Sequence, residues 1–208
     1  MFDALKGRAA QAIDEGIYRQ YSVMVPLIRK EDGIHVLFEQ RASRLKRQPG
    51  EICFPGGGRE PGETPLENAI RETMEELQLQ QGQIHVIAEM DYMLTVYQNK
   101  ISVFMCELTD YDMQFSEAEV ARVFTVPLRF FLNTRPEVYY NTIIARQPEN
   151  FPFDKVPGGR KYPWKNGRTG IYFYYYEDYV IWGLTAYIMQ GVVKTLKAEA
   201  GLREGDPI

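Results

Sequence analysis

The sequence predicts an α/β protein, because segments with strand periodicity and segments with helix periodicity both occur along it. Apolar and polar residues alternate within residues 21–39, which is the two-residue period of a strand. Apolar residues spaced by three and four within residues 64–79 indicate a helix, and a similar pattern begins at Trp182. With 208 residues and no internal repeat, the chain is expected to form one domain over residues 1–208.

Composition and charge argue against several classes of protein. The chain carries 24 Lys and Arg against 28 Asp and Glu, whereas a general nucleic-acid binder is usually basic. No apolar run reaches the roughly 20 residues that cross a bilayer, and the start from Met1 to Lys6 lacks a signal-peptide pattern. Cys53 and Cys106 lie in apolar, strand-like runs and are expected to be reduced thiols. We therefore expect a cytoplasmic protein with no nucleic-acid or membrane partner.

The first elements are predicted to be a helical extension and a hairpin. Residues 2–14 are partly amphipathic, so residues 1–20 are expected to form an N-terminal helical extension. Strands are expected over Tyr21–Ile28 and Ile34–Glu39. An Asp32–Gly33 turn separates them, which favours antiparallel pairing of the two strands.

A short acidic helix follows a run of three glycines at residues 56–58. Thr64 suits the N-cap, Pro65 suits the first helical position, and Glu67 completes a capping box. At about 100° per residue, one stripe of the helix is largely apolar and consists of Leu66, Ala69, Ile70, Thr73 and Leu77. This stripe is expected to face the core.

Three carboxylates share a neighbouring face of the same helix. Glu72, Glu75 and Glu76 are three or four residues apart, where like charges repel by roughly a few tenths of a kcal/mol per pair. Arg71 can offset part of this repulsion through Glu75. A solvated acidic face is one interpretation, but the preceding glycine run lets backbone approach a ligand closely. Carboxylates facing such a turn suit hard divalent cations such as Mg²⁺.

This segment resembles the Nudix box, written G-x5-E-x7-R-E-U-x-E-E-x-G-U, in which U is an apolar residue. The fixed positions that match are Gly57, Glu63, Arg71, Glu72, Glu75, Glu76 and Leu79. Thr73 stands at the first apolar position and keeps a methyl group on the packed face. Gln78 replaces the final glycine, which is expected to change the helix C-cap and to leave the chemistry intact, because glycine favours the left-handed conformation found there.

A basic loop that precedes the glycine run contains Arg41, Arg44, Lys46 and Arg47. By composition alone, an anion-binding loop and a solvated loop are equally good interpretations. The stretch resembles the signature of the coenzyme A pyrophosphatase branch of the Nudix family, with matches at Leu37, Arg41, Ala42, Gly50, Phe54, Pro55, Gly56 and Gly57. Lys46 replaces an Arg and keeps the charge without the bidentate fork. Phe38 and Glu39 also depart from the signature, and Glu39 replaces a Thr.

Further strands are expected in the second half of the chain, because apolar and aromatic runs lie between turn residues. The expected strands are Gln83–Thr95, Ile101–Leu108, Val123–Pro127, Glu137–Arg146 and Ile171–Tyr176. Residues 96–100 are expected to form a short loop, and Pro127–Leu132 a helical turn. His35 and His85 alternate within strands, where a structural role is expected.

The end of the chain combines a long polar segment with a last helix. Residues 147–170 are rich in Pro and Gly and are expected to form a long irregular loop. Its basic and aromatic side chains leave two interpretations open, a surface for an adenine ring and a phosphate or a mobile insertion. The last helix is expected to bury Leu184, Ile188, Gly191, Val192 and Thr195. Its start at residues 182–186 resembles the close of the same Nudix branch.

The resemblance implies a Nudix α/β/α sandwich, in which a mixed, curved sheet lies between helices. It implies hydrolysis of the diphosphate of coenzyme A or acyl-coenzyme A, giving phosphopantetheine or its acyl form and adenosine 3′,5′-bisphosphate. Mg²⁺ or Mn²⁺ would be held by Glu72, Glu75, Glu76 and the Gly56 carbonyl. Two alternatives are another Nudix specificity, such as ADP-ribose or a dinucleotide, and a non-catalytic Nudix-like binding module. A module of that kind is expected to lack some of the box carboxylates, and all are present here.

The resemblance also implies roles for individual residues and a small-molecule nucleotide conjugate as the substrate. Glu72, Glu117 or Glu119 would take the proton from water. Arg71 would orient the carboxylates, and Glu63 would brace the turn or reach a metal through water. The substrate is expected to contact Arg41, Arg44, Lys46, Arg47, Phe54 and Gly57. A homodimer is expected for a member of this family.

Overall fold

The computed structural model describes residues 3, 6–7, 15–203 and 205–206. The helix expected over residues 2–14 lies mostly outside these ranges. The first described element is a single 3-10 turn, η2 (Glu15–Ile17). Among the helices in the described ranges, none is long and apolar enough to cross a membrane.

A mixed sheet forms the centre of the molecule, as the resemblance implied. Its strand order is β3-β2-β1-β6-β5, with β4 paired to β1 and β7 paired to β2. β1 and β6 run parallel, and the other pairs are antiparallel. The strands are β1 (Arg19–Lys30), β2 (Gly33–Arg41), β3 (Ile52–Cys53), β4 (Gly56–Gly58), β5 (Ile84–Leu94), β6 (Asn99–Leu108) and β7 (Val120–Pro127).

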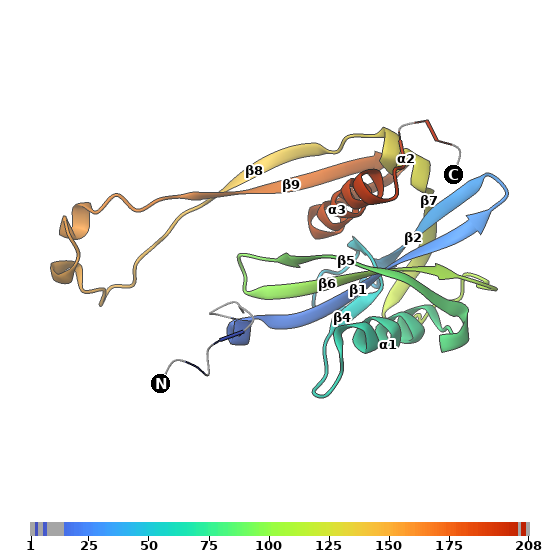
Figure 1. Ribbon diagram of the computed structural model, residues 1–208, viewed down its shortest axis with the longest axis horizontal. Coiled ribbons are helices and arrows are strands. Elements are labelled where there is room, and N and C mark those ends of the chain that lie inside the picture. Colours follow the sequence, from blue (N-terminus) through green and yellow to red (C-terminus); the bar gives the residue numbers. More distant parts are fainter. Residues whose placement is uncertain (1–2, 4–5, 8–14, 204, 207–208) are drawn as a thin grey trace.

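Helices cover both faces of this sheet and produce three layers (Figure 1). One face is covered by α1 (Pro65–Leu77), which a short 3-10 turn, η3 (Gln81–Gln83), connects to β5. The other face is covered by α2 (Leu128–Asn133) and α3 (Gly183–Glu199). The α/β/α sandwich expected from the sequence is therefore confirmed.

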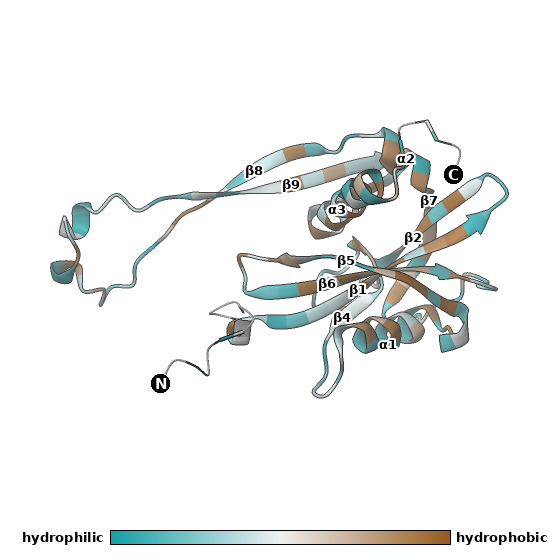
Figure 2. Cartoon of the chain, viewed as in Figure 1, coloured by the Kyte–Doolittle hydropathy of each residue, from teal (hydrophilic) through white to brown (hydrophobic). Residues whose placement is uncertain are grey.

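The two faces of the sheet have separate cores. Side chains alternate along a strand, so Leu37 and Phe38 of β2 point to opposite faces. Leu37 belongs to the core under α1, and Phe38 belongs to the larger core under α2 and α3. Figure 2 shows hydrophobic residues recurring along the central strands and on α1. β2 therefore contributes one row of side chains to each layer, and its α1-facing row leads to the candidate site.

The capping box expected at the start of α1 is confirmed. The Glu67 N–H donates to Thr64 Oγ1 at 3.2 Å, and the Thr64 N–H donates to Glu67 Oε2 at 2.8 Å. Ala69, Thr73 and Leu77 are buried, as the apolar stripe predicted. The Thr73 hydroxyl donates to the carbonyl of Ala69 at 2.7 Å, which allows a Thr to be buried at an apolar position of the box.

Gln78 ends α1 in the left-handed conformation, with φ 51° and ψ 42°, so this residue adopts the backbone that a glycine usually provides. The side chain is exposed and a left-handed residue with a Cβ is strained. Gln78→Gly is expected to raise the free energy of unfolding by about 0.5–1 kcal/mol. Chemical denaturation followed by circular dichroism measures this change. The matched control is Gln80→Gly, at φ −92°, which should not stabilise the protein; equal stabilisation by both would contradict the explanation.

Residues 137–176 form an arm that extends away from the sandwich (Figure 1). A separate antiparallel sheet contains β8 (Glu137–Ile143), β9 (Gly167–Tyr176) and β10 (Tyr179–Trp182). The strand expected over residues 137–146 ends three residues early, and residues 167–170, expected to be irregular, belong to β9. These residues have weak strand propensity but pair in register with β8, from Gly170↔Tyr140 to Gly167↔Ile143. β10 was not predicted.

The tip of this arm holds most of the segment expected to be irregular. It contains two short 3-10 turns, η4 (Phe153–Lys155) and η5 (Gly159–Lys161). Aromatic rings pack on one another there, with Tyr162 and Trp164 centroids 4.8 Å apart. Figure 1 places this tip far from α1, so the segment does not complete a nucleotide site beside the carboxylates of the same chain.

The buried face of α3 differs from the predicted stripe. Leu184 remains 38% exposed, whereas Ile188 and Val192 are buried as expected. The face packed on the sheet is Thr185, Ala186, Ile188, Met189, Val192, Val193 and Leu196. The predicted stripe was wrong at Leu184 because helical spacing alone does not say which face of the helix meets the sheet.

Candidate active site

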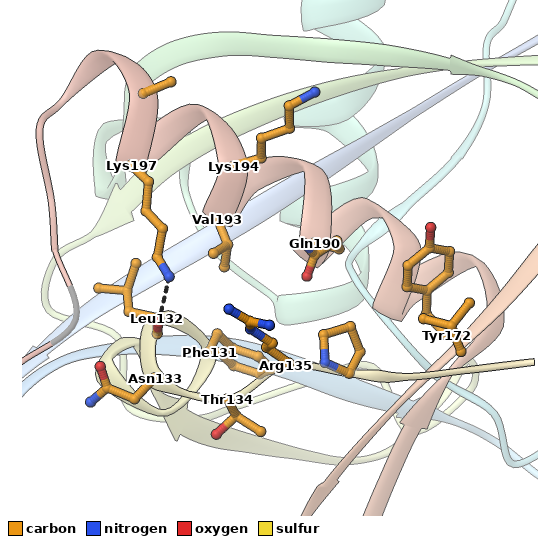
Figure 3. Close-up of a pocket in the computed structure, with 13 residues that line it drawn as sticks. Phe131, Leu132, Asn133, Thr134, Arg135, Tyr172, Gln190, Val193, Lys194 and Lys197 are labelled. Carbon is orange, nitrogen blue, oxygen red and sulfur yellow. Dashed lines mark hydrogen bonds between the residues drawn. The ribbon is translucent and has the colours of Figure 1, made fainter.

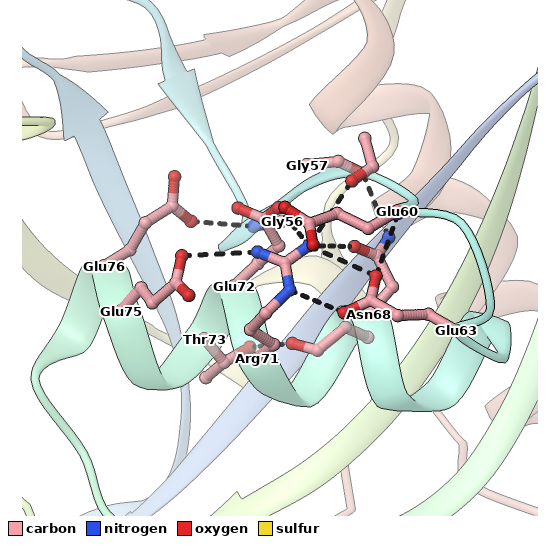
Figure 4. A network of polar contacts seen from close by, with 12 residues as sticks. Gly56, Gly57, Glu60, Glu63, Asn68, Arg71, Glu72, Thr73, Glu75 and Glu76 are labelled. Atoms are coloured by element: carbon pink, nitrogen blue, oxygen red, sulfur yellow. Dashed lines mark hydrogen bonds and ion pairs between the residues drawn. The ribbon is translucent and has the colours of Figure 1, made fainter.

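The carboxylates of α1 lie where this helix crosses the glycine strand β4 (Figure 4). The Gly56 N–H donates to Glu76 Oε2 at 2.8 Å, and the Glu76 side chain is only 2% exposed. A Cβ added to Gly57 would lie 2.4 Å from Glu72 Cδ. The glycine run therefore lets Glu76 reach the Gly56 N–H and lets Glu72 lie against Gly57, where a larger residue would displace the Glu72 carboxylate.

Arg71 is the centre of a polar network on the exposed side of the same crossing (Figure 4). Its Nε donates to Glu63 Oε1 at 2.7 Å, and its Nη2 donates to Asn68 Oδ1 at 2.8 Å. The same guanidinium forms ion pairs with Glu72 at 2.9 Å and Glu75 at 3.3 Å. Arg71 thus joins the turn before the helix to two of the three box carboxylates.

The charges of this network shift the pKa values of its members in opposite directions. The hydrogen bond to Glu63 raises the pKa of Arg71, and the same bond lowers the pKa of Glu63. Burial raises the pKa of Glu72, although Arg71 opposes the change. Burial and the nearby charge of Glu39 raise the pKa of Glu76. Burial therefore disfavours the charged form of Glu72 and of Glu76, and Arg71 compensates for this at Glu72.

Glu39 is a site residue that sequence reasoning missed. It lies on β2, is fully buried, and its Oε2 atom has no hydrogen-bond partner in the described part of the protein. Cys53, its neighbour on β3, donates its thiol hydrogen to Glu39 Oε1 at 3.2 Å. The available signal was a Glu in a strand that otherwise reads as apolar, at the position where the coenzyme A signature has a Thr.

The loop before β7 also reaches the site. The Ser116 N–H donates to the Glu76 carbonyl, and the Ala42 N–H donates to the Glu119 carbonyl, both at 2.8 Å. These bonds tie the loop to the end of α1 and to the end of β2. The charge of Glu119 contributes to the raised pKa of Glu39 and of Glu72. Of the two candidate bases on this loop, Glu119 is therefore better placed than Glu117.

The basic loop contributes one side chain to the carboxylate cluster. Arg41 Nη1 lies 3.8 Å from Glu76 Oε1, and the Arg41 side chain is 20% exposed. Arg44 is exposed and donates to the carbonyl of Ala118 at 3.2 Å. Lys46 and Arg47 are exposed on the surface.

Phe54 corrects an expectation about substrate contacts. Its side chain is 3% exposed and stacks on Phe38, with ring centroids 4.9 Å apart. Both rings belong to the core on the α3 side of the sheet. Phe54 is therefore a core residue whose packing holds the start of the glycine run, and its ring is not presented to a ligand.

Cys53 and both histidines have polar partners, and Cys106 is buried in the core. Both thiols are free, and burial raises the pKa of Cys53 and of Cys106. His35 Nε2 lies 2.9 Å from Asp32 Oδ1, and His85 Nε2 lies 3.0 Å from Thr109 Oγ1. The expected structural role of both histidines is consistent with these contacts. Both cysteines are unbridged, as expected, and Cys53 also contacts the site through Glu39.

A surface depression of about 830 Å³ lies across the sheet from these carboxylates (Figure 3). It is lined by α2, α3, the link at residues 134–136, and parts of β8 and β9, and Arg135, Lys194 and Lys197 contribute charge. Lys197 Nζ donates to the carbonyl of Leu132 at 2.7 Å. None of the site residues expected from the sequence lines this depression, so it is separate from the candidate site.

The side chains present suit a divalent cation, although the conformation shown does not gather a full ligand set. Within the described ranges, no three His, Cys, Asp or Glu side chains are arranged to hold a metal ion. Glu72 is paired with Arg71, and the Glu75 side chain is 57% exposed. In contrast, Glu76 and Glu39 are buried carboxylates with little compensating charge. Hard cations prefer such oxygen ligands, so the donor set fits Mg²⁺ or Mn²⁺.

These features, a capped acidic helix over a glycine strand in an α/β/α sandwich, define the family. Residues 18–140 match the family model described as the NUDIX domain. The chain therefore belongs to the Nudix hydrolase family. Members of this family generally use divalent metal ions such as Mg²⁺ or Mn²⁺ and act on small nucleotide derivatives.

Individual relatives agree with this assignment. The chain is 33% identical over 171 residues to the peroxisomal coenzyme A diphosphatase NUDT7 of Mus musculus, covering 80% of this chain and 66% of the mouse protein. It thus spans just under two thirds of that relative. It is 26% identical to the uncharacterized Nudix hydrolase NudL of Enterobacter sp. (strain 638), covering 89% and 84%. A crystal structure of a MutT/nudix family protein from Enterococcus faecalis aligns with 93% of this chain and 67% of its own, with a TM-score of 0.51 and 12% identity, which supports the fold alone.

The stability of the metal-free protein is expected to fall as the pH rises from about 5 to about 8. The pKa values of Glu39, Glu72 and Glu76 are raised in the folded protein, mainly by burial. The folded state therefore binds protons that the unfolded chain has already lost above a pH of about 4.3. Groups with lowered pKa values, such as Glu63, act mainly below this interval.

Thermal unfolding in EDTA at several pH values tests this expectation. Glu76→Gln should have a shallower dependence of Tm on pH, because one of the responsible carboxyls is removed. Added Mn²⁺ should reduce the fall in the wild type, since a cation replaces the lost protons. A Tm that is constant or rises over the interval in EDTA would show that these carboxyls are not strained by burial.

Proposed function

We propose that this protein hydrolyses the diphosphate of coenzyme A or acyl-coenzyme A to phosphopantetheine, or its acyl form, and adenosine 3′,5′-bisphosphate. The observation that carries the proposal is the complete set of box carboxylates on α1, seated against the glycine strand with Arg41 of the basic loop at 3.8 Å from Glu76. The mouse relative is named a coenzyme A diphosphatase, which supports the choice of substrate.

One set of site residues would bind the divalent cation, and another residue would accept the proton from water. Glu72, Glu75 and Glu76 would hold Mg²⁺ or Mn²⁺, which when bound polarises a phosphoryl oxygen and lowers the pKa of water. Arg71 positions Glu72 and Glu75 and holds the Glu63 turn in place. Because Glu72 is paired with Arg71 here, ion binding requires its carboxylate to exchange part of this pairing.

Glu119 is the proposed general base. It lies on the loop that is hydrogen-bonded to the ends of α1 and β2, and its side chain is exposed to solvent. An exposed carboxylate on the loop beside the buried ones is within reach of solvent water and can act as a general base. Glu72, whose pKa is raised by burial, is the competing candidate.

The basic loop is the proposed site of the substrate phosphates. Arg44, Lys46 and Arg47 are exposed and lie on the same loop as Arg41, which reaches the carboxylates. Arg and Lys side chains bind phosphate oxygens, Arg in a bidentate manner. This placement directs the anionic end of a nucleotide conjugate toward the glycine strand.

A substrate panel with mass detection of products tests the proposed function. Coenzyme A, acetyl-coenzyme A, ADP-ribose and diadenosine polyphosphates would each be incubated with the protein and Mn²⁺. The expected result is phosphopantetheine and adenosine 3′,5′-bisphosphate from coenzyme A, at a kcat/KM above that for ADP-ribose. Preference for ADP-ribose would favour another Nudix specificity. Binding of these compounds with no product would favour a non-catalytic module.

Lys46→Ala is expected to raise the KM for coenzyme A by roughly tenfold, because a charged hydrogen bond to phosphate contributes about 1.5 kcal/mol. Hydrolysis of ADP-ribose should change less, since that substrate lacks the 3′-phosphate. The matched control is Lys30→Ala, on the far end of β1, where the Lys side chain donates to Thr125 Oγ1. An equal loss for all substrates would remove the specificity role from this loop.

A further inference from the structure

Glu39 has no role in the proposed function, although its strand faces α1, the helix that carries the box carboxylates. Every second residue of a strand projects from the same face of its sheet. In β2 this row contains Leu37, Glu39 and Arg41. Leu37 packs in the core beneath α1, and Arg41 Nη1 reaches Glu76 Oε1 of α1 at 3.8 Å. Glu39 lies between them on this row and therefore points toward the end of α1 that carries Glu76.

The carboxylate of Glu39 has fewer partners than its burial requires. Its side chain is 0% exposed, Oε1 accepts one thiol hydrogen from Cys53, and Oε2 accepts no hydrogen bond within the described ranges. A thiol is a weak donor. A buried carboxylate normally has charged partners or several hydrogen bonds, because burying an unpaired charge is strongly unfavourable.

Neighbouring basic side chains do not supply the missing charge. Arg41 lies beside Glu39 and Glu76, and one guanidinium can balance only one of these two carboxylates. Arg71 is already shared among Glu63, Glu72 and Glu75. The Glu39 and Glu76 pair therefore has an excess negative charge that a proton or a cation must neutralise.

We propose that Glu39 is a ligand of the divalent cation in this protein, in addition to the carboxylates of α1. The inference rests on the proposed function, which places the cation beside Glu76. The unpartnered Oε2 supplies the type of oxygen that Mg²⁺ and Mn²⁺ prefer. Because the coenzyme A signature has a Thr at this position, the additional carboxylate is a feature of this sequence and increases the negative charge available to the ion.

Direct Mn²⁺ titration tests this proposal without measuring turnover. Free Mn²⁺ would be followed by electron paramagnetic resonance with wild-type protein, Glu39→Gln and Glu39→Thr. Both substitutions should weaken Mn²⁺ binding by about tenfold or more, because they remove a charged ligand. Glu89→Gln, an exposed position on β5, is the matched control and should bind like the wild type. Gln is close in shape to Glu and uncharged, so Glu39→Gln should fold, which circular dichroism verifies.

The possible results separate this inference from the proposed function. Weak binding by both Glu39 variants, with normal binding by Glu89→Gln, supports the cation ligand. Affinities within about twofold of the wild type would overturn it and identify Glu39 as a protonated partner of Glu76. In that case, Mn²⁺-dependent hydrolysis by the wild type would leave the proposed function intact. A wild-type protein that binds no Mn²⁺ would overturn both.

Discussion

Glu76→Gln is expected to lower kcat for Mn²⁺-dependent hydrolysis by at least about a hundredfold, because even residues that only support metal ligands contribute about 10- to 100-fold. The substituted amide can still accept the Gly56 N–H, which lies 2.8 Å from Glu76 Oε2. The substitution also removes a buried negative charge close to Glu39, so the metal-free variant should be at least as stable as the metal-free wild type. Steady-state kinetics and thermal unfolding measure the two effects.

The same substitution at a surface glutamate serves as the control for this test. Glu89→Gln removes a carboxylate from an exposed position on β5 and should leave kcat unchanged. A large loss of activity in Glu76→Gln together with an unchanged or raised Tm would support a role in ion binding. Turnover near the wild-type rate would refute the assignment of Glu76 as a ligand. Loss of both activity and folding would instead indicate that Glu76 is needed for the crossing of α1 over β4.

Gly56→Ala is expected to destabilise the protein by about 3 kcal/mol or more, the largest stability effect predicted for a single methyl group in this chain. A Cβ at this position would lie 2.3 Å from the carbonyl oxygen of Ser22 on β1, and the backbone φ is +154°. Neither obstacle can be removed by rotating a side chain, because both involve the backbone of paired strands. Chemical denaturation measures the change.

Gly57→Ala provides the matched comparison, one residue away. The added Cβ would meet the Glu72 carboxylate, which is the mobile end of a side chain. The fold should therefore lose about 1 kcal/mol or less, while kcat should fall by about a hundredfold, because Glu72 is displaced from its position. Equal destabilisation by the two substitutions would contradict the assignment of a structural role to Gly56 and a functional role to Gly57.

Local sequence determined α1 and the residues it presents. The capping box of Thr64 and Glu67 uses only neighbouring groups, so its residue types specify the helix start directly. The positions of Glu72, Glu75 and Glu76 follow from helical spacing once the start is fixed. For the same reason, the hairpin of β1 and β2 and the strands β5 and β6 could be predicted within about two residues of their ends.

Strand pairing over long distances decided what local patterns missed. Residues 167–170 contain two glycines and do not resemble a strand, but they pair with β8 across the arm. The short β10 is defined by its pairing with β9, from Trp182↔Phe173 to Tyr179↔Tyr176. The β8–β9 pairing joins segments that are distant in the chain, so short-range periodicity carries little information about it. The β9–β10 pairing is local, since Tyr176 and Tyr179 flank the turn, and the short length of β10 left its periodicity too weak to predict.

The sequence by itself determined the family, the acidic helix, the glycine run before it and the basic loop, because each depends on residue types at short, fixed spacings. Only the tertiary structure decided which of these residues meet. It placed Arg41 at Glu76 and Lys46 on the surface, and it put Phe54 in the core on the opposite face of the sheet. It also buried Glu39 beside Glu76, because neighbouring residues on a strand face opposite layers and the α1-facing row of β2 continues to the end of that helix.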